Sequence, residues 1–122
     1  MKQNSNSDTK KSIIVKLNVE GIHRWAGCDM EEVKYLQYPH RHTFIITCQI
    51  QVDHEDRAVE FIAFKHRIAS YINLKWYQVE YGCHDFGTMS CEHIASDLLE
   101  EFNLDKCSVS EDDEFWGVVE RI

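Results

Sequence analysis

The sequence predicts an α+β domain in which a four-stranded antiparallel sheet carries two helices on one face. Two observations support this prediction. Apolar and polar residues alternate through residues 13–23 and 40–52, a pattern typical of half-buried strands. Apolar residues then recur at spacings of three and four through residues 61–73, and again after Ser90, which is typical of amphipathic helices. With 122 residues, 43% of them hydrophobic, the chain is long enough for one such domain and too short for two.

The first two strands are separated by a long connection. The alternation in residues 13–23 predicts a strand that ends at His23. Residues 24–39 lose the alternation and contain the only proline of the chain, so a connection or a short helix is expected there. In the second strand, residues 40–52, the even positions share one face: His42, Phe44, Ile46, Cys48, Ile50 and Val52.

The second half of the chain is expected to supply both helices and two more strands. The first helix should run from Phe61 to about Asn73. Residues 74–89 have no clear period and are expected to form a loop with an extended piece. Ser90 is a suitable N-cap for the second helix. Asp105 and Lys106 resemble a turn, and two short strands, 108–110 and 116–122, then flank an acidic hairpin at 112–114, which completes the order β-β-α-α-β-β.

Composition limits the partners and the compartment. The formal net charge of −8, with 13 basic residues against 21 acidic ones, argues against a nucleic-acid-binding surface. Residues 1–12 are too polar to offset the entropy of ordering, so we expect a disordered tail before a domain at 13–122. Five cysteines without a C-x-x-C pair indicate reduced thiols. No apolar run approaches a membrane span and no signal-peptide core is present, so a soluble, cytoplasmic protein without membrane partners is expected.

Three histidines are the main candidate for a metal site. His40 and His42 are two apart at the start of the second strand, so both imidazoles project from the same face. His23 ends the first strand. Neighbouring antiparallel strands joined by a long connection bring these ends together, and three imidazoles with one open position suit a catalytic zinc ion. A His-x-His pair alone, however, is also common at a strand edge that binds no metal.

These residues resemble the 6-pyruvoyltetrahydropterin synthase and 6-carboxytetrahydropterin synthase family of the tunnelling fold, over about residues 13–122. The chain looks like a divergent member. The resemblance implies zinc bound by His23, His40 and His42. It also implies homo-oligomers, such as trimers or hexamers, in which sheets join side by side into a barrel. An apolar edge strand, which is a liability for a monomer, favours the same assembly.

Further segments extend the likeness. Glu60-Phe61 with Lys65 resembles the start of the family's first helix, and Ser90-Cys91-Glu92 resembles its Thr-x-Glu at the start of the second. The likeness implies that Glu111 anchors a pterin ring, with Ser90 and Glu92 beside it. A carboxylate suits this role because it accepts two parallel hydrogen bonds from a 2-amino-4-oxopyrimidine edge. Simpler explanations remain open: a helix dipole favours Glu92 without a ligand, and Glu111 adjoins a solvated acidic hairpin.

The sequence departs from the family at the catalytic residues. The family places a cysteine four to six residues before the His-x-His, where this chain has Lys, Tyr and Leu at 34–36. Cys28 lies twelve residues before that pair. The family's Asp-His dyad is absent near Leu74, and His84 and Asp85 stand in reversed order and too close to the second helix. Cys28, His84 and Asp85 are therefore weak catalytic candidates, and the general base is unassigned.

Three hypotheses for the function remain open from the sequence. The first is a zinc-dependent, lyase-like synthase acting on a dihydropterin triphosphate or a related purine-like ligand, in a tetrahydrobiopterin-like or queuosine-like (deazapurine) pathway. In such an enzyme the metal would act as a Lewis acid on ligand oxygens. The second is a non-catalytic protein that binds or sequesters a purine- or nucleotide-like small molecule, which the missing catalytic residues favour. A metal-stabilised structural oligomer is a third reading.

Overall fold

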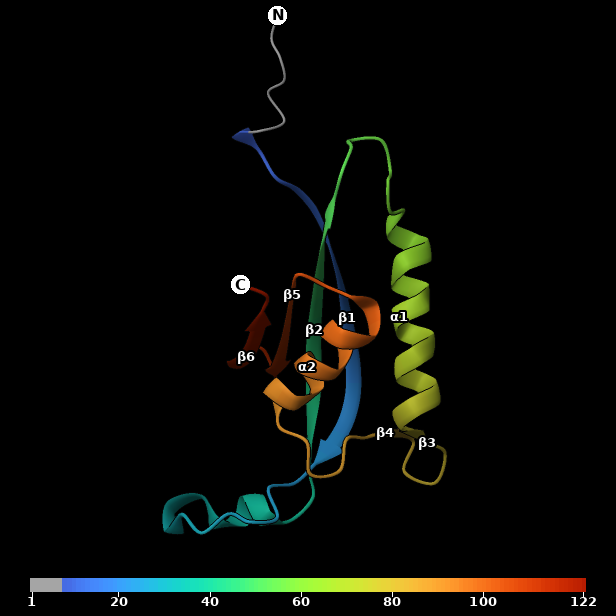
Figure 1. Cartoon of the computed structure of the whole chain (residues 1–122). Helices are drawn as coiled ribbons and strands as arrows, with labels where there is room; N and C mark the ends of the chain where they lie inside the picture. The colour runs from blue at the N-terminus through green and yellow to red at the C-terminus, as the bar shows by residue number, and fades with distance from the viewer. Residues whose placement is uncertain (1–7) are drawn as a thin grey trace, which may run out of the picture.

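The structure is a computed structural model that describes residues 8–122, and its centre is a six-stranded sheet in the order β3-β4-β1-β2-β5-β6 (Figure 1). The elements are β1 (Lys11–His23), the 3-10 helix η2 (Glu31–Gln37), β2 (His40–Val52), α1 (Phe61–Trp76), β3 (Tyr77–Gln78), β4 (Cys83–Asp85), α2 (Cys91–Phe102), β5 (Lys106–Glu111) and β6 (Phe115–Glu120). The predicted α+β class and the order of the main elements are confirmed.

The four predicted antiparallel strands are present, but they form only part of the six-stranded sheet. Strands β1, β2, β5 and β6 pair antiparallel, and β1 and β2 stay in register from Lys11 opposite Val52 to His23 opposite His40. Strands β3 and β4 lie where a loop with an extended piece was expected. The predicted sheet of four antiparallel strands was wrong in leaving them out, because β4 pairs parallel to β1 and makes the sheet mixed. Strands of two and three residues are too short to show a period of two.

Several predicted boundaries also change. Strand β1 begins at Lys11, inside the stretch expected to be disordered, because its partner β2 extends to Val52. The rest of that predicted tail is residues 1–10, of which 1–7 lie outside the described residues. Helix α1 continues to Trp76, whose side chain is buried one turn beyond Ile72. Strand β5 starts at Lys106, where a turn was expected, and β6 ends at Glu120.

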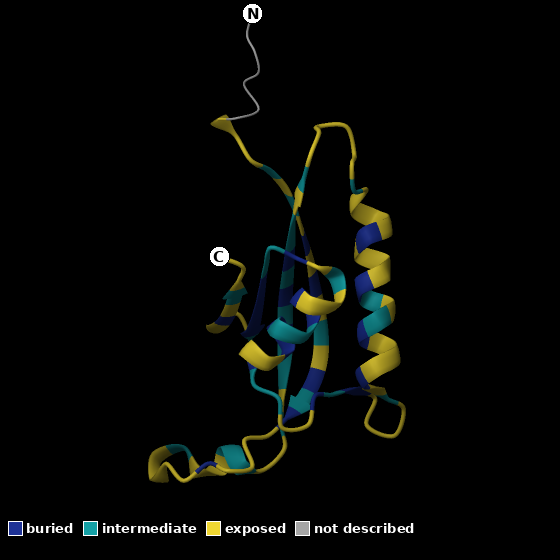
Figure 2. Ribbon diagram, in the orientation of Figure 1, coloured by how far each residue is buried: buried dark blue, intermediate teal, exposed yellow. Residues whose placement is uncertain are grey.

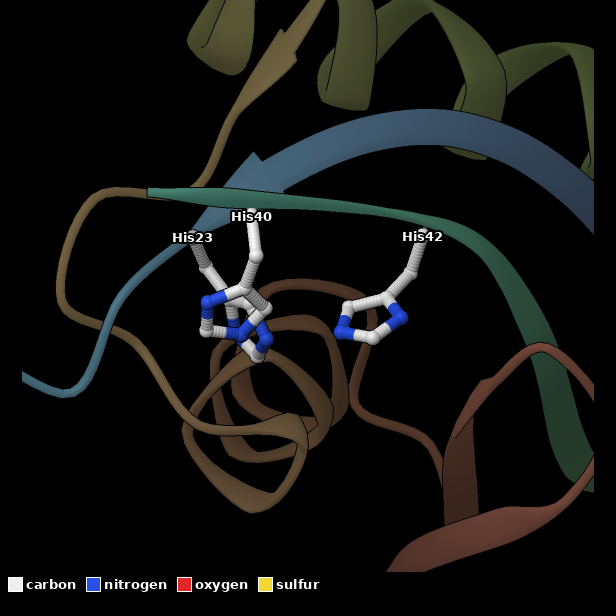
Figure 3. Close-up of side chains that lie close together, drawn as sticks. All are labelled: His23, His40 and His42. Carbon is white, nitrogen blue, oxygen red and sulfur yellow. The ribbon is translucent and has the colours of Figure 1, made fainter. Parts of the chain in front are cut away.

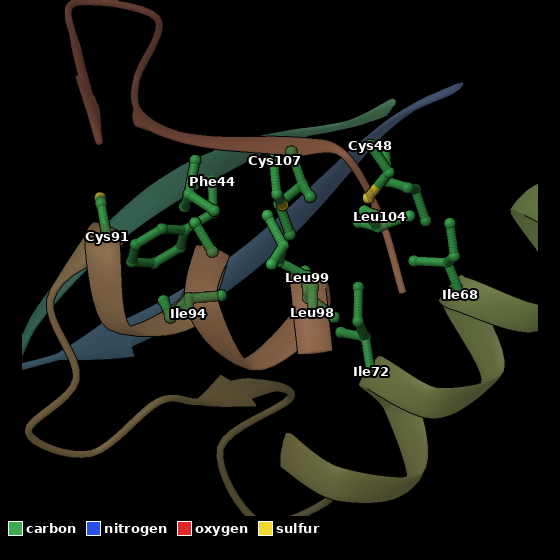
Figure 4. Close-up of a cluster of buried hydrophobic side chains, with 14 of the residues drawn as sticks. Phe44, Cys48, Ile68, Ile72, Cys91, Ile94, Leu98, Leu99, Leu104 and Cys107 are labelled. Atoms are coloured by element: carbon green, nitrogen blue, oxygen red, sulfur yellow. The ribbon is translucent and has the colours of Figure 1, made fainter. Parts of the chain in front are cut away.

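Both helices cover the same face of the sheet and bury its apolar residues (Figures 1 and 2). Phe44, Ile46 and Cys48, which alternate along β2 as predicted, are fully buried. They pack against side chains from both helices, including Ile68, Ile72, Ile94, Leu98 and Leu99 (Figure 4). Burial of each such side chain contributes about 1.5–3 kcal/mol, so this layer holds the strands that carry the candidate site.

Helix α2 begins at the predicted N-cap. The Ser90 hydroxyl accepts a hydrogen bond from the His93 backbone N–H at 3.1 Å, and the His93 ring nitrogen Nδ1 accepts one from the Ser90 N–H at 3.2 Å. This reciprocal capping box fixes the first turn of α2. Neither helix in residues 8–122 is long and apolar enough to cross a membrane.

Candidate functional site

The three predicted histidines converge where β1 ends and β2 begins. His23 lies opposite His40 in the ladder, and His42 follows on the same face of β2. One ligand atom of each ring lies within 4.8 Å of the other two. Figure 3 shows the rings extending to one side of the sheet. Strand pairing therefore assembles the cluster that the sequence predicted, with His23 buried and the other two rings half-buried.

Each imidazole is oriented by a hydrogen bond at Nδ1. The distances are 2.9 Å from His23 to the Met89 carbonyl, 2.8 Å from His40 to the Tyr38 carbonyl and 2.7 Å from His42 to the Asp112 carboxylate. Carbonyl and carboxylate oxygens only accept, so Nδ1 carries the proton in all three rings. In a neutral imidazole the lone pair is then on Nε2. A histidine that binds a metal through Nε2 is commonly held in this way, with its Nδ1–H donated to an oxygen.

Within residues 8–122, the Nε2 atoms of His23 and His42 are buried without a hydrogen-bond partner. An unpartnered buried polar atom is costly, and bound metal is one way to satisfy it. Imidazole nitrogens suit zinc and similar divalent ions. The donor set of this cluster therefore fits the metal that the family resemblance implies.

The Glu111 carboxylate faces the histidines from the end of β5. Its Oε2 lies 3.0 Å from His23 Nε2 and its Oε1 lies 3.7 Å from His42 Nε2, as charge contacts outside hydrogen-bond geometry. The contact with His23 lowers the pKa of Glu111 against the opposing effect of burial. Burial acts to lower the pKa of His23, but Glu111 and the Met89 carbonyl together raise it.

Asp112 is a site residue that the sequence analysis missed. It occupies the turn between β5 and β6, where Asp112 and Asp113 both take positive φ, 57° and 63°. One carboxylate oxygen contacts His42, and the other accepts a hydrogen bond from the Thr43 N–H at 2.9 Å. The pKa of Asp112 is lowered, first by His42 and then by that N–H. Its place directly after Glu111, at the start of a three-residue hairpin turn, was the available signal.

A cavity of about 300 Å³ opens beside the histidines. The predicted site residues His23, His40, Ser90, Glu92 and Glu111 line it. Arg24 and Trp25 line it too, and each offers a planar group for stacking. The structure thus brings the predicted ligand-binding side chains together next to the candidate metal ligands.

The weak catalytic candidates lie elsewhere. Cys28 is buried in the β1–β2 connection, where its thiol donates to the Val33 carbonyl at 3.5 Å. Asp85 accepts from a loop N–H. His84 is buried, with Nδ1 at 3.0 Å from the Glu20 carbonyl and Nε2 at 2.7 Å from the Asn73 side-chain oxygen. None of the three candidates is among the residues that line the cavity.

Cys91 does line the cavity, but as a protonated thiol. Its Sγ lies 3.8 Å from Glu111 Oε2, to which it donates. Burial, followed by the charge of Glu111, raises the pKa of Cys91 to about 12. A thiol in this state is a weak nucleophile.

No protein-family model matches the sequence, and no curated protein matches it significantly. Solved structures do match. An uncharacterized protein from Wolinella succinogenes is 12% identical with a TM-score of 0.71, covering 93% of this chain and 99% of that one. The 6-pyruvoyl tetrahydropterin synthase of Caenorhabditis elegans is 11% identical with a TM-score of 0.64, covering 93% and 97%.

A catalytic-residue mutant of the Plasmodium vivax 6-pyruvoyltetrahydropterin synthase is 13% identical with a TM-score of 0.63, covering 93% of this chain and 99% of that one. At such identities the likeness is one of fold, and it extends over nearly the whole of each chain. The protein therefore has the tunnelling fold of the 6-pyruvoyltetrahydropterin synthases, as a divergent example of it.

Proposed function

We propose that this protein is a zinc-binding, pterin synthase-like protein whose ligand is a pterin or a related purine-like molecule. One observation carries the proposal. His23, His40 and His42 converge with every Nδ1 fixed by an oxygen, and two of their Nε2 atoms are buried with no hydrogen-bond partner among the described residues. The cavity beside them is of a size and composition that suit a flat heterocycle.

The cavity offers the groups that such a ring requires. Glu111 and Glu92 provide carboxylates for the N–H groups of a 2-amino-4-oxopyrimidine edge, and Ser90 adds a hydroxyl. Trp25 supplies an aromatic plane. These side chains come from three separate segments of the chain, so the cavity depends on the complete fold.

A bound zinc ion would supply Lewis-acid chemistry to oxygens of the ligand's side chain. The protein's own part is to hold the three imidazoles, orient the ring and restrict water. Proton transfer is not assigned to any residue, since Cys91 stays protonated and the His93 Nδ1 is used in the helix cap.

A second function, binding or sequestration without turnover, is favoured by a specific observation. Cys28, His84 and Asp85, the weak candidates for proton transfer, do not line the cavity. A protein with the metal site and ring pocket but without an acid–base pair would retain its ligand unchanged.

Metal analysis tests the common part of both functions. Protein purified without chelator should contain one zinc ion per chain, and His40→Ala should remove it. His66→Ala is the matched control, because His66 is exposed on α1 outside the candidate cluster. Absence of any divalent ion in the wild-type protein, with no effect of His40→Ala, would contradict the proposal.

Incubation with dihydroneopterin triphosphate separates the two functions. Product formation that survives Cys28→Ala and is lost in His42→Ala indicates an enzyme with another base. Tight binding with quantitative recovery of the unchanged ligand indicates sequestration.

We also propose a homo-oligomer, such as a trimer or hexamer. It is supported by the exposed apolar side chains on edge strand β6, where Trp116 and Val118 are about half exposed.

A further inference from the structure

Glu111 occupies an unusual electrostatic position. Among the described residues its ion-pair partners are His23 and His42, and it has no contact of this kind with a lysine or arginine. Only 25% of its side chain is exposed, so solvent screens it incompletely. A nearby positive charge stabilises a half-buried carboxylate of this kind.

The histidines alone do not provide that charge in their neutral form. Because Nδ1 of each ring donates to an oxygen, the Nε2 atoms of His23 and His42 present lone pairs toward Glu111. Lone pairs and a carboxylate repel one another unless a proton or a metal cation lies between them. A cation at this point would contact both imidazoles and the carboxylate.

The distances suit a shared metal ion. Zinc binds imidazole nitrogen and carboxylate oxygen at about 2.0–2.2 Å, so neighbouring ligand atoms of a tetrahedron lie roughly 3.3–3.5 Å apart. The Glu111 oxygens lie 3.0 Å from one Nε2 and 3.7 Å from the other, on either side of that separation. Glu111 also lies opposite Phe44 in the β2–β5 ladder. Phe44 is two residues along β2 from His42 and therefore on the same face, so the strands hold Glu111 on the histidine face.

We propose that Glu111 is the fourth metal ligand in the protein without a bound heterocycle, and closes a three-histidine, one-carboxylate site. This inference rests on the metal site proposed above. Since Glu111 also lines the cavity, a ring that engages its carboxylate must take it from the metal. The fourth coordination position of the metal would then become open only when the heterocycle is bound.

Zinc competition against a chromogenic chelator tests the ligand role directly. Glu111→Gln should weaken zinc binding more than about 100-fold, beyond the roughly 10- to 100-fold cost of losing a supporting partner of a ligand. Glu92→Gln is the matched control: Glu92 lines the same cavity but, among the described residues, the carboxylates that contact the histidines are those of Glu111 and Asp112, so this variant should leave zinc affinity unchanged. Equal zinc affinity in wild type and Glu111→Gln would overturn the inference while leaving the three-histidine site intact.

Cobalt substitution of the wild-type protein gives an independent readout that does not depend on a variant folding. A site closed by Glu111 should show the visible spectrum of four-coordinate Co²⁺ and should not change on addition of azide. Addition of neopterin should change that spectrum. An immediate azide response would show an open, water-bound position and overturn the inference, whereas failure of the wild type to bind Co²⁺ or Zn²⁺ would overturn the proposed metal site as well.

Discussion

Asp112 determines which nitrogen His42 presents to the centre of the cluster. Its carboxylate accepts a hydrogen bond from His42 Nδ1, with 2.7 Å between nitrogen and oxygen, and is itself fixed by the Thr43 N–H. Asp112→Asn removes the negative charge that makes this hydrogen bond strong, so it should weaken zinc binding by roughly 10- to 100-fold. The measurement is zinc competition with a chelator at neutral pH.

Asp113→Asn is the control for that substitution. Both positions have positive φ, which asparagine tolerates, so the two variants impose the same change on the turn. The Asp113 side chain makes no hydrogen bond or ion pair among the described residues, and zinc affinity should stay at the wild-type value. Equal loss in both variants would attribute the effect to the hairpin and remove Asp112 from the site.

At the scale of residues, the sequence predicted the candidate metal ligands better than the groups that orient them. His23, His40 and His42 were predictable because strand alternation and strand ends determine their positions. The carbonyls of Tyr38 and Met89 were not, since any residue has a carbonyl and its direction depends on the path of a loop. The orientation of these imidazoles therefore depends on how the loops fold, which the sequence pattern does not predict.

The contact between β6 and α2 shapes the cavity at the scale of elements. A Cβ atom at Gly117 would lie 2.9 Å from the backbone nitrogen of Glu92 and 3.0 Å from the Cβ of Cys91. Gly117→Ala should therefore push the first turn of α2 away from β6 and cost about 1–3 kcal/mol of unfolding free energy. Urea unfolding measures that loss, and weaker pterin binding should accompany it, because Ser90 and Glu92 belong to the displaced turn.

Gly27→Ala is the corresponding control. A Cβ at Gly27 meets no atom within 4 Å, so this variant should unfold at the wild-type urea concentration or slightly above it. If Gly117→Ala were as stable as Gly27→Ala, close packing of β6 on α2 would not be what positions this turn.

Elements with a long periodic pattern were predictable and short ones were not. The 13-residue strands β1 and β2 alternate through most of their length, and α2 has both a buried stripe and a capping serine. Strands β3 and β4 exist only because the chain after α1 passes beside β1. Near Leu74, where the sequence lacks the family's Asp-His dyad, Lys75 instead forms an ion pair with Asp97 of α2 at 2.6 Å.

On the scale of the whole molecule, the two faces of the sheet are unequal. Both helices cover one face, while residues that alternate with the core point to the other face. On that other face Ile14, Trp116 and Val118 are 58%, 44% and 50% exposed. Strand β6 is also an edge of the sheet, with unpaired backbone groups that another strand can use.

Side-by-side assembly would cover both the exposed apolar side chains and the free edge of β6, and a charge on β6 should prevent it. Wild-type protein should elute with the mass of a trimer or hexamer in light-scattering chromatography, and Val118→Glu should shift it to the monomer mass, because burial of an unpaired carboxylate in the interface is costly. Leu74→Glu is the control. It also replaces an exposed apolar side chain by a carboxylate, but Leu74, which is 89% exposed, lies on α1, so this variant should keep the wild-type mass. A monomeric wild type, or an assembly unaffected by Val118→Glu, would mean that β6 ends the sheet in solution as it does in the single chain.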